Sequence, residues 1–214
     1  MKKIMLTALI GSLLILPFAS TALALPEEAA APVPVQEYLP GRVPARTGAA
    51  EAMSPALHAV VLAMINQDAD RFDPTDGALA WESLYNLLSL YGRLDNRTVE
   101  DGSVLLLPEE TAWDYAAALS LNPDGMGSLP SGILDRLRYD NVSRCYGVTP
   151  GEDGLSQIEI RDVQNTASGV QLTGALVFLP DGRDLVRFQA ALQPQDNLFG
   201  WSLDEMNLLV EGLA

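Results

Sequence analysis

The spacing between apolar residues changes after residue 132, and this change constrains the fold more than any other feature of the sequence. Before it, apolar residues recur every three or four positions, as they do on one face of a helix. After it, they alternate with polar residues, as they do on a half-buried antiparallel strand. Helices first and strands afterwards are typical of the α+β class, in which helices pack on one face of an antiparallel sheet.

Three segments carry the helical pattern, and they predict helices over 55–67, 74–91 and 109–121. The first two open with a capping residue followed by proline, Ser54-Pro55 and Asp73-Pro74, which is a common start signal. Gly92 follows the second helix at the position where a left-handed cap is expected. The third helix has two acidic residues in its first turn, where the helix dipole favours them.

Alternation predicts strands over 142–148, 155–163, 170–179 and 186–192, joined by turn-forming residues. The closing segment, 199–210, is ambiguous. Its Ser202-Leu203-Asp204-Glu205 matches a helical capping box, whereas the surrounding apolar residues alternate with a slip. We favour a strand there, which gives a C-terminal antiparallel meander of four to five strands.

The order of these elements over residues 55–210 is similar to that of the nuclear-transport-factor-2-like (NTF2-like) and cystatin-like α+β rolls. No sequence motif carries this resemblance. It implies, as an alternative arrangement, a curved sheet that wraps the helices and leaves a conical pocket. No site residue is transferred from it, because a fold does not define a function.

The N-terminus has the three parts of a secretory signal peptide over residues 1–24. Lys2 and Lys3 are followed by an apolar run, Ile4 to Leu16, and then by a small-residue cleavage site that predicts cutting between Ala24 and Leu25. The run is too short to span a membrane, and we expect no transmembrane segment in the mature chain. Basic and apolar regions as short as these are typical of bacterial signal peptides. We therefore expect a periplasmic or secreted protein.

Residues 25–53 are rich in proline and alanine and contain few large aliphatic residues. Such a segment buries too little apolar surface to offset the entropy of ordering its backbone, so we predict a disordered spacer. The remaining residues, 54–214, are predicted to form a single α+β domain, long enough to bury one core.

Composition excludes several functions. The chain has 13 Lys+Arg against 28 Asp+Glu and a formal charge of -15, so a nucleic-acid partner is not expected. One cysteine cannot form an internal disulfide, and one Cys with one His cannot form a usual zinc site. Both lysines lie in the signal peptide, so Schiff-base catalysis and a Walker lysine are excluded in the mature chain.

The single histidine and the single cysteine are interpreted as structural. His58 lies in an apolar helical segment, and no G-x-S-x-G motif supplies a serine nucleophile for it. Cys145 lies in a predicted interior strand, so we expect its thiol to be buried. The alternative is an intermolecular disulfide, because an oxidising compartment favours one and the chain has no second cysteine.

An acidic loop between the first two helices is a candidate calcium site, since calcium prefers several oxygen ligands on a flexible loop. Its spacing does not match an EF-hand, and helix capping already explains the last two of its carboxylates. The candidate ligands are Asp68, Asp70, Asp73 and Asp76. No other cofactor is expected.

Aromatic residues on the second and third helices and on the strands could instead line a ligand pocket between helices and sheet. Plain core packing is the alternative interpretation of the same spacing. The candidate pocket residues are Trp81, Tyr85, Tyr91, Trp113, Tyr146 and Trp201. Four arginines could orient an anionic ligand there. They are Arg138, Arg144, Arg161 and Arg187.

Together these features predict a secreted or periplasmic, non-catalytic module that binds a small ligand or an envelope protein. The alternative is a hydrolase with a pair of carboxylates that acts on an envelope or extracellular polymer. The carboxylates of such a pair are defined by their separation in space, and the sequence does not select them. The oligomeric state is left open.

Overall fold

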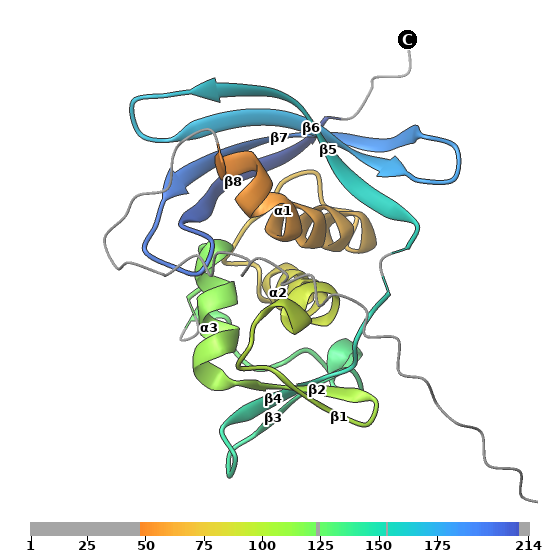
Figure 1. Cartoon of the computed structure of the whole chain (residues 1–214), viewed down its shortest axis with the longest axis vertical. Helices are drawn as coiled ribbons and strands as arrows, with labels where there is room; N and C mark the ends of the chain where they lie inside the picture. Colours follow the sequence, from red (N-terminus) through yellow and green to blue (C-terminus); the bar gives the residue numbers. More distant parts are fainter. Residues whose placement is uncertain (1–47, 123–124, 153, 210–214) are drawn as a thin grey trace, which may run out of the picture. The chain divides into compact units, whose positions relative to one another are not determined.

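The computed structural model describes residues 48–122, 125–152 and 154–209, all within one compact unit that spans Leu39–Ala214. The predicted signal peptide, its cleavage site and most of the predicted spacer lie outside the described residues. Within them the fold is α+β, as the sequence predicts (Figure 1). Three helices precede or interrupt a small four-stranded antiparallel sheet, and a second four-stranded antiparallel meander follows.

Helix α1, Ala49–Asn66, begins six residues before the predicted start at Pro55. Its first turns come from residues 49–53, which the sequence analysis assigned to the spacer. Ala49, Ala50 and Met53 are buried there, and Ala49 and Met53 expose no surface. Alanine is the best helix former, and its small side chain allows close packing, so this short segment can extend the helix although it lacks large aliphatic residues.

Helix α2, Gly77–Tyr91, begins three residues later than predicted and ends where predicted. Asp76 is its N-cap, and its Oδ1 accepts hydrogen bonds from the backbone N–H groups of Ala78 and Leu79 at 3.0 and 3.3 Å. The prediction for Gly92 is wrong, because its φ of -59° is right-handed and it opens a short 3-10 helix, η2 (Gly92–Leu94). A Cβ at Gly92 would lie 3.1 Å from a Leu107 methyl carbon, so close packing explains this glycine.

Helix α3, Glu109–Ala118, ends three residues before the predicted Leu121. Ser120 follows in the left-handed region with φ of 55°, which terminates the helix. The Ser120 hydroxyl donates to the carbonyl oxygen of Leu203 at 2.6 Å and so ties this helix end to the last strand.

The C-terminal meander has the order β5-β6-β7-β8, and every neighbouring pair is antiparallel. Its strands are β5 (Ser156–Asn165), β6 (Val170–Phe178), β7 (Arg183–Pro194) and β8 (Trp201–Leu209). The ambiguous closing segment is therefore a strand, and the favoured prediction is confirmed. Helix α1 contacts β5, β6 and β8, which places a helix on one face of the meander as predicted (Figure 1).

The second sheet has the order β1-β2-β4-β3 and was not predicted as a separate sheet. Its strands are β1 (Val99–Asp101), β2 (Val104–Pro108), β3 (Leu137–Asp140) and β4 (Cys145–Val148). The predicted strand over 142–148 belongs here, and its first three residues form a turn in which Arg144 has φ of 51°. Cys145 is half-buried, so the predicted burial of its thiol is wrong.

Helix α2 packs against α1 and α3, and it also contacts the small sheet at β4. One apolar cluster runs through the helices and both sheets. Among the described residues, α1 is the one helix long and apolar enough to cross a membrane by length and composition. Its packing against α2 and the meander accounts for that apolar composition.

Candidate functional site

A pocket of about 400 Å³ lies where the end of α1, the first half of α2 and the segment 130–136 meet. Its polar wall consists of Asn66, Gln67, Glu82 and Arg136, and its apolar wall includes Ala78 and Ile133. We call this the Glu82 pocket. Pro130 and Gly132 complete its lining. Its volume falls within the range of about 300–1,000 Å³ that is usual for small-molecule sites.

Helix geometry places Glu82 on the pocket wall. Ala78 and Glu82 lie four residues apart on α2, so they occupy one face of the helix. The Asp76 cap, two residues before Ala78, fixes where this helix begins. Arg136, which follows the short 3-10 helix η4, Ser131–Ile133, lies beside Glu82 in the pocket lining.

The Glu82 side chain is only 8% exposed, which is unusual for a carboxylate. Its Oε2 lies 3.6 Å from Nη2 of Arg136, and its Oε1 accepts from Nδ2 of Asn66 at 3.4 Å. Both contacts are long, because a charge-assisted N–H···O bond is usually about 2.7–2.9 Å. A carboxylate has about four acceptor positions. Among the described residues, the Glu82 carboxylate therefore makes only two weak polar contacts, although it is nearly buried and has little contact with water.

Arg136 is held in place from two sides. Its guanidinium carbon lies 4.5 Å from the centre of the Tyr85 ring, and its Nη2 donates to the carbonyl oxygen of Gly132 at 3.4 Å. Stacking of this kind orients an arginine without using its N–H donors. The side chain remains 43% exposed, so a ligand can reach it.

The six aromatic residues proposed from sequence do not line one pocket. Trp113 lies between Trp81 and Tyr146, with ring centroids 6.5 and 5.6 Å away. Tyr139, which the sequence analysis did not select, packs on Tyr146 at 4.8 Å. These four rings form a cluster between α2, α3 and the small sheet, and burial raises the pKa of Tyr146 to about 12. The cluster therefore has the character of core packing.

The other three aromatic residues lie in different surroundings. Tyr85 stacks on Arg136 at the Glu82 pocket. Trp201 is completely buried on β8. Tyr91 ends α2, and its hydroxyl lies 2.7 Å from Nδ1 of His58.

All four arginines that were proposed to bind an anionic ligand form ion pairs with exposed or partly exposed carboxylates of this chain. Arg161 and Arg187 share Asp184 on β7 at 2.9 and 3.0 Å. Arg138 pairs with Asp135 at 3.9 Å, and Arg144 pairs with Glu109. The arginine at the pocket is Arg136, which sequence reasoning missed because it lies outside every periodic segment and no motif precedes it.

The acidic loop does not form a metal site in the part of the chain that the structure describes. No group of three or more His, Cys, Asp or Glu side chains there is arranged to hold a metal ion. Asp73 accepts hydrogen bonds from the Thr75 N–H and hydroxyl at 2.9 and 2.7 Å, which lowers the pKa of Asp73. Asp76 caps α2, Asp68 lies at a positive φ of 53°, and Asp70 is exposed. The calcium hypothesis therefore gains no support.

His58 is buried in α1, and it joins three elements. Its Nε2 lies 3.1 Å from Oγ of Ser156 on β5, and its Nδ1 is bonded to the Tyr91 hydroxyl at the end of α2. A serine and a histidine at this distance are also found in nucleophilic sites, but such sites need an adjoining cleft for the substrate. Neither residue lines the Glu82 pocket. We interpret the chain of bonds as structural, in agreement with the sequence analysis.

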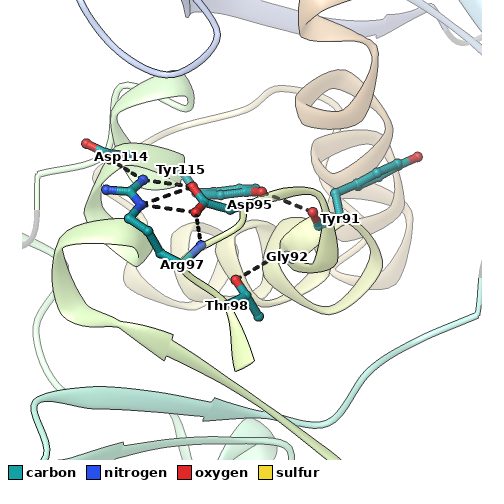
Figure 2. A network of polar contacts seen from close by, with 7 residues as sticks. All are labelled: Tyr91, Gly92, Asp95, Arg97, Thr98, Asp114 and Tyr115. Carbon is teal, nitrogen blue, oxygen red and sulfur yellow. Dashed lines mark hydrogen bonds and ion pairs between the residues drawn. The ribbon is translucent and has the colours of Figure 1, made fainter. Parts of the chain in front are cut away.

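A second polar network fixes the loop between α2 and β1 (Figure 2). Arg97 binds Asp95 through Nε at 3.0 Å and Nη2 at 2.7 Å, and Nη2 also reaches Asp114 at 2.6 Å. The hydrogen bonds from Arg97 lower the pKa of Asp95, whose side chain is 4% exposed. Tyr115 donates to the carbonyl oxygen of Tyr91 at 3.0 Å. Because these groups satisfy one another, the network stabilises the loop and offers no ligand site.

Comparison with protein-family models found no matching family, and comparisons with curated proteins and with solved structures found no match.

Proposed function

We propose that this protein is an exported, non-catalytic module that binds a small polar ligand in the Glu82 pocket. The observation that carries the proposal is a nearly buried carboxylate in a pocket wall with two long polar contacts among the described residues. A buried charge without good partners is costly, and a ligand with hydrogen-bond donors would offset that cost. Export is supported by the signal-peptide pattern of residues 1–24.

Binding is favoured over hydrolysis by the composition of this pocket. An acid-pair hydrolase needs two carboxylates facing one cleft. Among the described residues that line the pocket, Glu82 contributes the one carboxylate. The same wall contains an arginine and two side-chain amides, Asn66 and Gln67, which are groups that orient a ligand and do not transfer its atoms.

Isolation of the protein from the envelope fraction of its host, followed by native mass spectrometry, tests both parts of the proposal. The mature chain should begin at Leu25 and carry a small molecule that denaturation releases. The Glu82→Gln variant should lose that molecule, because the amide cannot supply the negative charge. Glu110→Gln, at an exposed position in the first turn of α3, is the matched control and should retain it.

Two results would overturn the proposal. An N-terminus at Met1 in the exported fraction would exclude the predicted processing. A wild-type protein without a bound molecule, together with no binding to the Glu82 pocket in a screen of small polar compounds, would exclude the ligand-binding role.

A further inference from the structure

We infer that the ligand of the Glu82 pocket is a free α-amino acid with an uncharged aliphatic side chain, held by its ammonium and carboxylate groups. This inference rests on the proposed function and names the ligand class for the same site. Its basis is the juxtaposition of Glu82 and Arg136, with Asn66 beside them, on one wall of the pocket.

The two charged side chains are near each other but poorly paired. Their closest oxygen and nitrogen atoms are 3.6 Å apart, and neither group has a partner at charge-assisted distance among the described residues. Arg136 has five N–H donors on three nitrogen atoms. Of these three atoms, only Nη2 has oxygen partners among the described residues, the carbonyl oxygen of Gly132 at 3.4 Å and Oε2 of Glu82 at 3.6 Å. Both groups thus retain capacity for a shorter partner.

A ligand with only a carboxylate would pair with Arg136 and leave Glu82, which is 8% exposed, without its partner, and an unpartnered buried charge is costly. A ligand with only an ammonium would pair with Glu82 and leave Arg136, which is 43% exposed, with only water and the Gly132 carbonyl as hydrogen-bond partners. A ligand with an ammonium and a carboxylate on one carbon satisfies both, with the ammonium at Glu82 and the carboxylate at Arg136. The short distance between Glu82 and Arg136 requires that the two ligand charges also be adjacent, as in an α-amino acid.

The end of α1 adds to the charge distribution of the pocket. Asn66 is the last residue of α1 and lines the pocket, and the carbonyl end of this helix carries partial negative charge that favours the ammonium group of the ligand. At the start of α2 the Asp76 carboxylate already accepts from the Ala78 and Leu79 N–H groups. The ligand carboxylate is therefore assigned to Arg136 alone.

The remaining lining favours an aliphatic side chain. Ala78, Pro130 and Ile133 supply the apolar part of the pocket. They contain no charged group that would bind an acidic or basic side chain. A volume of about 400 Å³ is sufficient for one amino acid and small for a longer peptide.

Isothermal titration calorimetry with leucine and three analogues tests this inference. Leucinamide lacks the carboxylate, N-acetylleucine lacks the ammonium, and 6-aminohexanoate has both charges far apart. Leucine should bind, and each analogue should bind at least about tenfold more weakly, because each loses at least one charge-assisted hydrogen bond.

Variants identify the two groups. Glu82→Gln and Arg136→Gln should each weaken leucine binding at least about tenfold. Glu110→Gln and Arg138→Gln remove an exposed charge of the same sign and should leave leucine affinity unchanged. If a pocket variant fails to fold, leucine-dependent NMR shifts of the Asn66 and Gln67 side-chain amides in the wild-type protein give an independent measurement.

Each outcome separates the inference from the proposed function. Binding of leucinamide or N-acetylleucine as tight as that of leucine would overturn the amino-acid inference while a ligand-binding pocket remains. Leucine binding that is unchanged in both pocket variants would also overturn it. Absence of leucine binding, with a different molecule retained from the host and lost in Glu82→Gln, would overturn the inference and support the proposed function.

Discussion

Asp95 and Glu82 are both nearly buried carboxylates beside an arginine, yet they differ in how well their oxygen atoms are hydrogen-bonded, and this difference suits Asp95 to a structural role and Glu82 to ligand binding. Asp95 accepts from both the Nε and the Nη2 of Arg97, and it also accepts the Arg97 backbone N–H at 2.8 Å. Glu82 has contacts of 3.4 and 3.6 Å. A satisfied buried charge fixes a loop, whereas an under-satisfied one beside a cavity is suited to a ligand.

The Asp95→Asn variant should lower the free energy of unfolding at pH 7 by about 1–3 kcal/mol, because it removes charge-assisted hydrogen bonds to a buried acceptor. Asp114→Asn is the matched control, since Asp114 binds the same arginine but is 43% exposed, and it should cost less than about 1 kcal/mol. Urea unfolding curves measure both. Equal losses in the two variants would show that burial of Asp95 does not matter.

The same carboxylate predicts how stability depends on pH. Hydrogen bonds from Arg97 lower the pKa of Asp95 in the folded protein, whereas in the unfolded chain it should be about 3.9. A pKa that is lower in the folded state gives stability that is fully present above the unfolded pKa and is lost as the pH falls through the folded pKa. The difference in stability between wild type and Asp95→Asn should therefore shrink at the acidic end of an unfolding series below pH 4. A constant difference would contradict this assignment.

At the scale of elements, the meander could be predicted because its strands are long and alternate clearly. The first half of strand β6 alternates, with Val170 and Leu172 buried and Gln171 exposed, and this pattern is visible in the sequence, whereas residues 174–177 are buried on both faces. In the small sheet only β4 falls within a predicted strand. Its partners could not be predicted as a sheet, since β1 has only three residues, all exposed, and β2 is a short apolar run between two helices. Such a run has no period that distinguishes a strand from a buried helical segment.

The meander requires a glycine at position 174, because the neighbouring strands leave no space for a side chain there. A Cβ built there would lie 2.6 Å from Cζ of Phe188 and 2.9 Å from the carbonyl oxygen of Glu159. Gly174 pairs with Ile160 on β5 and with Phe188 on β7, so it lies at the centre of three strands. The Phe188 ring occupies the space that a side chain would need.

The Gly174→Ala variant should lower the free energy of unfolding by about 1–3 kcal/mol, because the added methyl group overpacks a site bounded by backbone. Gly154→Ala is the control, since a Cβ there has no neighbour within 4 Å, and it should change stability by less than about 0.5 kcal/mol. Thermal and urea unfolding give both values. If Gly174→Ala is as stable as Gly154→Ala, the strands shift without cost and the packing argument fails.

At the scale of the whole molecule, the binding site arises between segments that the sequence separates widely. Asn66 ends α1, Glu82 is in α2 and Arg136 follows η4. The packing of α1 against α2 brings the first two together, and the segment 130–136 lies against both at the pocket. Tyr85 is predicted from the sequence to line a pocket because it is aromatic. In the structure it lies at the Glu82 pocket because its ring stacks on Arg136. The fold class could be predicted from periodicity, which is local, whereas the pocket depends on contacts between elements, which no local pattern records.

The start of the folded unit gives a last prediction, because the first turns of α1 are buried although their sequence resembles that of a spacer. Met53 and Ala49 expose no surface, and both belong to the apolar core. A chain that begins at Gly48 should therefore be more stable than one that begins at Ser54, by about 2–5 kcal/mol, the usual cost of removing one large buried side chain. Urea unfolding of the two chains measures the difference, and Met53→Ala in the longer chain should account for most of it. Equal unfolding midpoints would mean that α1 is complete without residues 49–53 and that the boundary predicted from composition is the correct one.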